Sequence, residues 1–126
     1  MKKISTKKIP SLGPYSTCVL VENFLFISGQ IAIDPTTKKL ISETIEMETE
    51  RIMKNFKIIL SENQIGFENV IKTSFFIRNI DDYPKINSVY SKFFHKRDYP
   101  ARETIQVLGL PKNANIEISL IAQKLN

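Results

Sequence analysis

Residues 45–60, IEMETERIMKNFKIIL, mark the point where the hydrophobic pattern of this chain becomes helical. Their apolar side chains recur three and four positions apart and therefore form one stripe along a helix. Thr44 is the expected N-cap, and the two glutamates in the first turn suit the positive end of the helix dipole. Asn63 and Gly66 follow as a C-terminal stop. The stretch predicts a long amphipathic helix that covers one face of a larger structure.

Along the sequence, predicted strands precede and follow this helix. Two β-prone runs, 17–21 (TCVLV) and 24–31 (FLFISGQI), are joined by Glu22-Asn23, which predicts a tight hairpin. Asp34-Pro35 then begins a second turn, with room for one further short strand before the helix. After the helix, residues 70–77 (VIKTSFFI) are expected to form a buried strand.

The rest of the chain predicts a second helix and two more strands. Asp81-Asp82 introduces the helix, and Pro84 lies near its first turn, where a missing N–H costs little. The strands are expected at about 102–108 and 116–122. The apolar face of the second helix comprises Tyr83, Ile86, Tyr90, Phe93 and Phe94, and Asn87 lies on or beside it. The predicted class is α+β, with two helices packed on one face of a sheet.

Nothing in this chain remains to cover the other face of the sheet. That face still carries apolar residues, so we expect it to pack against other subunits. The length of 126 residues is enough for one domain, and no linker divides it, so residues 1–126 are expected to form a single domain.

The composition limits the classes of function. The net charge of +5 would attract anions, but the lysines are dispersed and basic-aromatic patterns of the RNA-binding type are missing, which argues against a nucleic-acid partner. Cys18 and His95 are the only residues of their types, so a His/Cys metal cage cannot be built within one subunit. We expect Cys18 to be buried. Neither a membrane span nor a secretory signal is predicted, which favours a cytoplasmic location, with an organelle still open.

The last two strands carry polar residues at alternate positions. Arg102, Thr104 and Gln106 share one face of the first strand, and Glu117 shares a face of the second with Ser119, opposite the expected core face. If these polar faces lie on the same side of the sheet, Arg102 and Glu117 line one cleft. The alternatives are exposed strand charges or a cross-strand salt bridge.

Six segments in order resemble the RidA (YjgF) family of reactive-intermediate deaminases. They are LGPYS (12–16), FISGQIAIDP (26–35), VIKTSFFIRNIDDY (70–83), INSVYSKFF (86–94), YPARETIQV (99–107) and LPKNANIEI (110–118). The resemblance implies a chorismate-mutase-like fold and a homotrimer with clefts between subunits. It also implies hydrolysis of enamines and imines, such as 2-aminoacrylate and 2-aminocrotonate, to 2-keto acids and ammonia, without a metal or organic cofactor.

The resemblance also assigns roles to residues. Arg102 matches the arginine that binds the substrate carboxylate, and Glu117 matches the glutamate that positions or activates the attacking water. The other expected substrate-binding residues are Tyr15, Ser28, Gly29, Asn87 and Thr104. Structural roles stay open for three of these: Tyr15 as an anchor of the N-terminal turn, Ser28 as a partner of backbone groups, and Asn87 as a tie between helix and loop.

This chain departs from the family pattern at four positions. Thr104 stands where many members carry cysteine, Glu103 replaces a small residue, Ser119 replaces a glutamate, and Lys38 stands at a turn glycine. Two other functions remain open. One is a single-stranded RNA endonuclease or translation inhibitor, favoured only by the net charge. The other is a non-catalytic regulatory trimer that binds small carboxylates.

Overall fold

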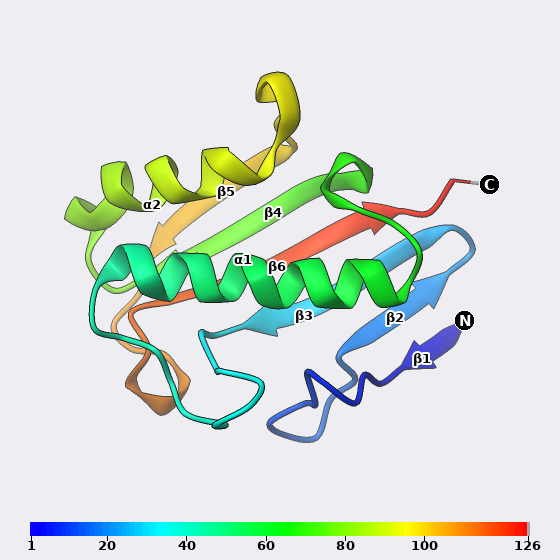
Figure 1. Ribbon diagram of the computed structural model, residues 1–126, viewed down its shortest axis with the longest axis horizontal. Coiled ribbons are helices and arrows are strands. Elements are labelled where there is room, and N and C mark those ends of the chain that lie inside the picture. The colour runs from blue at the N-terminus through cyan, green and yellow to red at the C-terminus, as the bar shows by residue number, and fades with distance from the viewer. Residues whose placement is uncertain (126) are drawn as a thin grey trace.

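A six-stranded mixed β-sheet carries both long helices on one of its faces in the computed structural model, which describes residues 1–125 (Figure 1). The strands are β1 Lys2–Ile4, β2 Cys18–Val21, β3 Phe24–Gln30, β4 Val70–Ile77, β5 Ala101–Gln106 and β6 Ile116–Gln123. The α-helices are α1 Ile45–Glu62 and α2 Tyr83–Tyr90. Short 3₁₀ turns occupy Phe67–Asn69, Ile80–Asp82, Ser91–Phe93, His95–Arg97 and Pro111–Asn113. None of the helices in residues 1–125 is long and apolar enough to cross a bilayer.

The strand order across the sheet is β1-β2-β3-β6-β4-β5. Neighbouring strands are antiparallel except β4 and β5, which are parallel. A parallel pair cannot be joined by a tight turn, and α2 lies in the crossover that joins this one. The predicted α+β class with two helices on one face is confirmed (Figure 1).

The turns and caps predicted from local sequence are present. Val21 pairs with Phe24 across the two-residue turn, in which Glu22 adopts a left-handed conformation with φ 54°. Thr44 caps α1, since its hydroxyl accepts a hydrogen bond from the Met47 amide at 3.1 Å. The helix runs two residues past Leu60 and ends at the predicted stop, with Asn63 as its C-cap.

Two differences concern short strands. The sequence did not predict β1, which pairs with β2 from Lys2 opposite Leu20 to Ile4 opposite Cys18. The further strand allowed before α1 is reduced to a single bridge between Ile33 and Leu40. A segment of three residues is too short to show the alternation of apolar and polar side chains that indicates a strand. Whether such a segment joins the sheet therefore depends on its pairing partner.

The hydrophobic core lies between the helices and the sheet. The predicted inner face of β6 is buried throughout, and Cys18 is buried as expected. Desolvation raises the pKa of the Cys18 thiol to about 12. The largest fully buried apolar side chains include Ile52, Met53, Phe56, Ile59 and Leu60 of α1, together with Leu25, Phe75, Ile77, Ile86, Ile116 and Ile118.

A buried carboxylate links α1 to the loop before β6. Glu48 is fully buried and accepts hydrogen bonds from the Asn115 backbone amide at 2.8 Å and from the Asn115 side-chain amide at 2.9 Å. From the sequence, the only role predicted for Glu48 was a favourable interaction with the positive end of the helix dipole. Its second role fixes the chain two residues before Glu117.

The opposite face of the sheet is left uncovered by the described residues, as predicted. Phe26 and Ile105 on this open face are 45% and 49% exposed. A polar group interrupts it, in which Glu103 pairs with Lys72 at 3.2 Å and accepts a hydrogen bond from the Ser74 hydroxyl at 2.7 Å. Apolar surface of this kind is typical of a subunit contact, and assembly remains a prediction.

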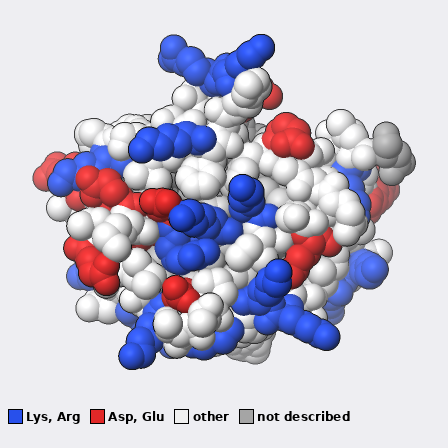
Figure 2. Space-filling model, viewed as in Figure 1, with Lys and Arg blue, Asp and Glu red and all other residues white. Residues whose placement is uncertain are grey.

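The helix-covered face carries charges of both signs. Lysine and arginine side chains are interspersed with aspartate and glutamate over this face (Figure 2). This mixture agrees with the dispersed charge seen in the sequence.

Candidate functional site: two half-sites on one chain

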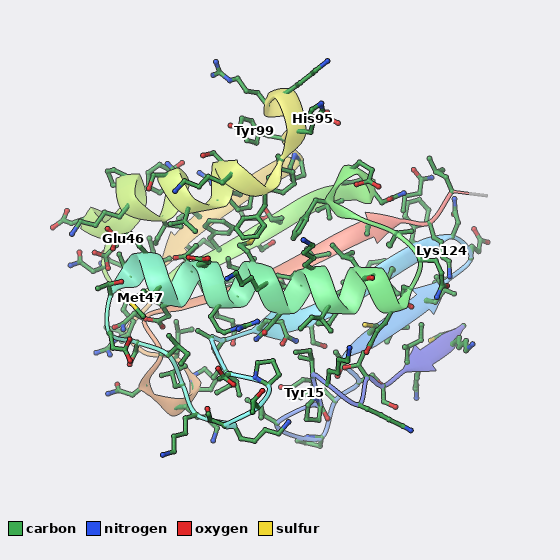
Figure 3. The ribbon with its side chains drawn as sticks, viewed as in Figure 1. Tyr15, Glu46, Met47, His95, Tyr99 and Lys124 are labelled. Carbon is green, nitrogen blue, oxygen red and sulfur yellow. The ribbon has the colours of Figure 1, made fainter. Side chains whose placement is uncertain are left out.

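The seven predicted site residues lie in two separate groups. The arginine half-site contains Arg102, Thr104 and Asn87, which line hollows beside β5 and α2. The glutamate half-site contains Tyr15, Ser28, Gly29 and Glu117, three of which line one hollow near the end of β3. Tyr15 lies at the opposite edge of the molecule from Tyr99, a residue beside the arginine half-site (Figure 3).

Strand register explains the separation. Residues paired across a sheet point to the same side. Arg102 pairs with the buried Thr73, which faces the helices, whereas Glu117 pairs with Phe76, three residues further along β4 and therefore on the open face. Within one chain, the two residues therefore point to opposite sides of the sheet, so the condition for a shared cleft is not met and the alternative of a cross-strand salt bridge between them does not hold.

Three aromatic rings surround the Arg102 guanidinium. Its central carbon lies 4.7 Å from the ring centroid of Phe75, 5.1 Å from that of Tyr83 and 5.2 Å from that of Tyr90. Tyr90 is itself held in place by an edge-to-face contact with Phe75 and a 2.9 Å hydrogen bond with the Thr73 hydroxyl. Contacts of this kind favour a cation near aromatic faces and restrict the directions in which the fork can point.

The Tyr83 hydroxyl contacts the guanidinium directly. Arg102 Nη2 donates a hydrogen bond to the Tyr83 oxygen at 2.5 Å. The positive charge of Arg102 is the main cause that holds the pKa of Tyr83 below its usual value, and hydrogen bonding from Arg102, Asn87 and Thr104 adds to it. These four side chains therefore form one polar cluster.

Hollows lie on both sides of Arg102. One is lined by Ile80, Asp81, Tyr83, Pro84, Arg102 and Thr104. The other is lined by Asn87, Tyr90, Ser91, Tyr99, Pro100 and Arg102. The Asn87 side-chain oxygen is buried and has no hydrogen-bond partner among the described residues, which is unusual for a buried polar atom. The arginine half-site thus combines a cation held among aromatic rings with polar groups beside two hollows.

Glu117 in the glutamate half-site is half-buried, and burial raises the pKa of its carboxyl. Gly29 lies directly beneath it. A Cβ atom at Gly29 would stand 2.8 Å from the Glu117 carboxyl carbon, which is closer than real contacts allow. Close approach of the β3 backbone to this carboxylate therefore requires a glycine.

Tyr15 and Ser28 also make structural contacts. The Tyr15 hydroxyl accepts a hydrogen bond from the Leu12 amide at 3.2 Å, and the residue as a whole is 46% exposed. The Ser28 hydroxyl donates to the Ser16 carbonyl at 2.6 Å. The structural roles left open for these two residues are therefore present, and the Tyr15 ring also lines the hollow that contains Gly29 and Glu117.

The sequence did not single out Tyr83 and Tyr90 as site residues. Both were assigned to the apolar face of the second helix; Tyr90 is buried there, whereas Tyr83 is exposed. The available signal was the phenol group, because a hydroxyl at the rim of a helix stripe often has a polar partner. The partner is Arg102, which only the fold brings into contact.

The chain resembles known proteins over nearly its whole length. Residues 5–124 match the family model described as Endoribonuclease L-PSP. The human protein named 2-iminobutanoate/2-iminopropanoate deaminase is 41% identical over 120 residues, which cover 94% of this chain and 87% of the human one. A protein of Lactococcus lactis that carries the name of a regulator, AldR, is 44% identical over 124 residues, which cover 98% of each chain.

A solved structure agrees with the fold. Escherichia coli TdcF, crystallised with bound serine, superimposes with a TM-score of 0.91 at 32% sequence identity. The match covers 99% of this chain and 100% of TdcF. The likeness therefore extends over both half-sites.

Proposed function

Because this chain belongs to the Endoribonuclease L-PSP family, which includes the Rid proteins, we propose that it hydrolyses small enamine and imine intermediates. The proposed substrates are 2-aminoacrylate and 2-aminocrotonate with their imine tautomers, and the products are 2-keto acids and ammonia. The supporting observation is that each chain carries Arg102 beside two hollows and the half-buried Glu117 on opposite faces of one sheet. The names of the human and plant relatives, both deaminases, favour the same reaction.

The separation of the half-sites supports an assembly in which two chains complete each site. In the proposed homotrimer of chorismate-mutase-like subunits, the open sheet faces pack together. Because β5 is the edge strand of the sheet, Arg102 of one copy would reach the rim of this contact and meet Glu117 on the open face of the next copy. Exposed Phe26 and Ile105 would become buried, which supplies a hydrophobic driving force for association.

Arg102 would bind the substrate carboxylate. A guanidinium can make two parallel hydrogen bonds to a carboxylate, and the surrounding rings keep its plane in a narrow range of orientations. TdcF was crystallised with bound serine, a small molecule that also carries a carboxylate. The Asn87 oxygen, which lacks a partner among residues 1–125, is available to an N–H of the substrate.

Glu117 would handle the proton of the attacking water. In its ionised form it accepts a proton from the water as the water oxygen bonds to the imine carbon, and it passes that proton to the imine nitrogen to give a carbinolamine. Glu117 then accepts the proton of the carbinolamine hydroxyl and passes it to the amino group as the C–N bond breaks, which releases ammonia, leaves the keto acid and returns the ionised carboxylate. A raised pKa brings this carboxylate closer to the pH at which proton transfer is most effective.

Replacement of Glu117 with glutamine is the direct test of this function. In an assay coupled to a pyridoxal-phosphate dehydratase that acts on serine or threonine, the wild type is expected to accelerate keto-acid formation. Glu117→Gln is expected to lose about a hundredfold of that rate, the usual contribution of one acid–base group. No acceleration by the wild type over buffer would contradict the proposal. The same variant also separates an enzyme from a regulator of the kind that the AldR name suggests, because ligand binding that survives without turnover favours the enzyme.

The pH dependence follows from the same carboxyl. Turnover requires ionised Glu117, so the rate should rise with pH through a pKa above the ordinary glutamate value, and Glu117→Gln should lack this rise. Between the ordinary and the raised pKa, the folded state binds more protons than the unfolded state. The free energy of unfolding should therefore fall as pH rises through that interval in the wild type, and less so in Glu117→Gln. Urea titrations at a series of pH values measure this difference.

Replacement of Gly29 with alanine is expected to displace the Glu117 carboxylate while leaving the fold in place. The added methyl group meets the flexible end of Glu117 rather than backbone, so the carboxylate shifts and turnover falls by about tenfold. Gly109→Ala is the matched control, because a Cβ atom at Gly109 has nothing within 4 Å. Equal turnover in the two variants would argue against a catalytic position for Glu117.

A further inference from the structure

Tyr83 makes a direct hydrogen bond with Arg102, and the resemblance assigns it no role. It is the first residue of α2 and the aromatic member of the polar cluster that also contains Asn87 and Thr104. Its ring lies against the guanidinium while its oxygen accepts a hydrogen bond from Nη2. Because the oxygen is the acceptor in that contact, the hydroxyl proton remains available for donation to another group.

The Tyr83 hydroxyl lies where an atom of a small anion would contact Arg102. A carboxylate that binds the Arg102 fork brings one oxygen close to an N–H of the guanidinium, and the Tyr83 oxygen already occupies such a place on Nη2. Tyr83 and Arg102 also line the same hollow, together with Thr104. A small anion entering this hollow therefore meets the phenol and the guanidinium together.

We propose that the Tyr83 hydroxyl is a second carboxylate-binding group beside Arg102, and that its ionised form excludes the substrate carboxylate from this site. This inference rests on the proposed function, since it assumes that Arg102 binds the acid group of the substrate. In the neutral form, Tyr83 accepts from Arg102 and donates its own proton to the bound carboxylate. In the ionised form, it has no proton to donate and carries a negative charge that pairs with Arg102.

The surroundings of Tyr83 make ionisation relevant to binding. Arg102 from β5 faces it, and this positive charge lowers its pKa. Asp81, in the turn before α2, lines the same hollow, while Tyr90 and Tyr99 line the hollow on the other side of Arg102. Burial raises the pKa of Tyr90, so Tyr83 is expected to ionise before Tyr90. In the proposed assembly, Glu117 of a second copy also faces this site.

Linkage fixes the direction of the effect. If ionised Tyr83 weakens carboxylate binding, then a bound carboxylate must raise the pKa of Tyr83. The free energy of that pKa shift equals the binding free energy lost on ionisation. Affinity should fall as pH rises through the pKa of Tyr83 in the empty site. Binding at alkaline pH should then be accompanied by uptake of one proton by the phenolate.

The test compares wild type with Tyr83→Phe, which keeps the ring over Arg102 and removes only the hydroxyl. Binding of 2-oxobutanoate, a product of the proposed reaction, is measured by calorimetry from about pH 7 to about pH 10. Near pH 7, Tyr83→Phe is expected to bind about three- to tenfold more weakly, because one hydrogen bond is lost. Towards pH 10, wild-type affinity should fall by about tenfold, whereas the affinity of Tyr83→Phe should change much less.

Two further measurements show whether Tyr83, rather than a neighbouring residue, causes the alkaline loss of affinity. At alkaline pH, 2-oxobutanoate should lower the ultraviolet absorbance of tyrosinate in the wild type but not in Tyr83→Phe. Asp81→Asn and Tyr99→Phe should retain the alkaline loss of affinity. Superimposable pH curves for wild type and Tyr83→Phe would overturn the inference and leave the proposed function standing. A wild type that neither binds 2-oxobutanoate nor accelerates keto-acid formation would instead overturn the proposed function.

Discussion

Replacement of Arg102 with alanine is expected to lower kcat/KM for imine hydrolysis by about ten- to a hundredfold, the effect of losing one charge-assisted carboxylate contact. Arg102→Lys should also have a low kcat/KM. The lysine ammonium keeps the positive charge but lacks the planar guanidinium fork that lies among the three rings. The dehydratase-coupled assay measures both variants. If the activity of Arg102→Ala stayed within twofold of wild type, Arg102 would not be the group that binds the substrate carboxylate.

Mixing the two impaired variants, Arg102→Ala and Glu117→Gln, tests whether the half-sites belong to different chains. Arg102→Ala retains Glu117, and Glu117→Gln retains Arg102, so a site formed between one chain of each kind can contain both groups. If the chains are dissociated, mixed in equal amounts and allowed to reassemble at random, about a quarter of the sites should be intact. Each variant taken through the same treatment alone is the control. No recovery of activity in a mixture shown to contain mixed oligomers would contradict sites between subunits.

Replacement of Glu48 with alanine is expected to cost about 2–4 kcal/mol in the free energy of unfolding, because two hydrogen bonds to a buried carboxylate are lost and both Asn115 donors lose this acceptor. Urea unfolding at fixed protein concentration measures the loss. Glu46→Ala is the matched control, since this glutamate lies in the same helical turn and is labelled near the start of α1 (Figure 3).

The control should change the free energy of unfolding by about 0.5 kcal/mol or less, as expected for a residue without a buried partner. Glu46 and Glu48 share their charge and their position near the helix dipole, so a large difference between the two variants isolates the contact with Asn115. Equal stability of the two variants would show that this contact contributes little. A fall in turnover in Glu48→Ala beyond the loss of folded protein would indicate that the contact also positions Glu117.

The sequence predicted those elements whose signals are local. The helical stripe of α1, its Thr44 cap, the Glu22-Asn23 turn and the buried face of β6 depend on spacing and on single-residue preferences, and all are present. The resemblance also identified Arg102 and Glu117 as candidates before any geometry was known. Their roles remain predictions for the experiments above.

Other features depended on contacts between distant segments. β1 exists because Lys2–Ile4 finds a partner in β2, and Glu48 is buried because Asn115 lies opposite it. Tyr83 meets Arg102 although 19 residues separate them. Neither periodicity nor propensity carries this information, because each describes a segment without its neighbours.

The amino-acid sequence by itself determined which residues alternate along each strand, and hence that Arg102 and Glu117 stand apart from their apolar neighbours. The apolar residues of β6 already placed Glu117 opposite the core, but only the tertiary structure decided that Arg102 points to the other side of the sheet. That choice depends on the register of β5 and β6 against the shared strand β4, where Arg102 meets Thr73 and Glu117 meets Phe76. A shift of one residue in either pairing would reverse the face, because side chains alternate with a period of two.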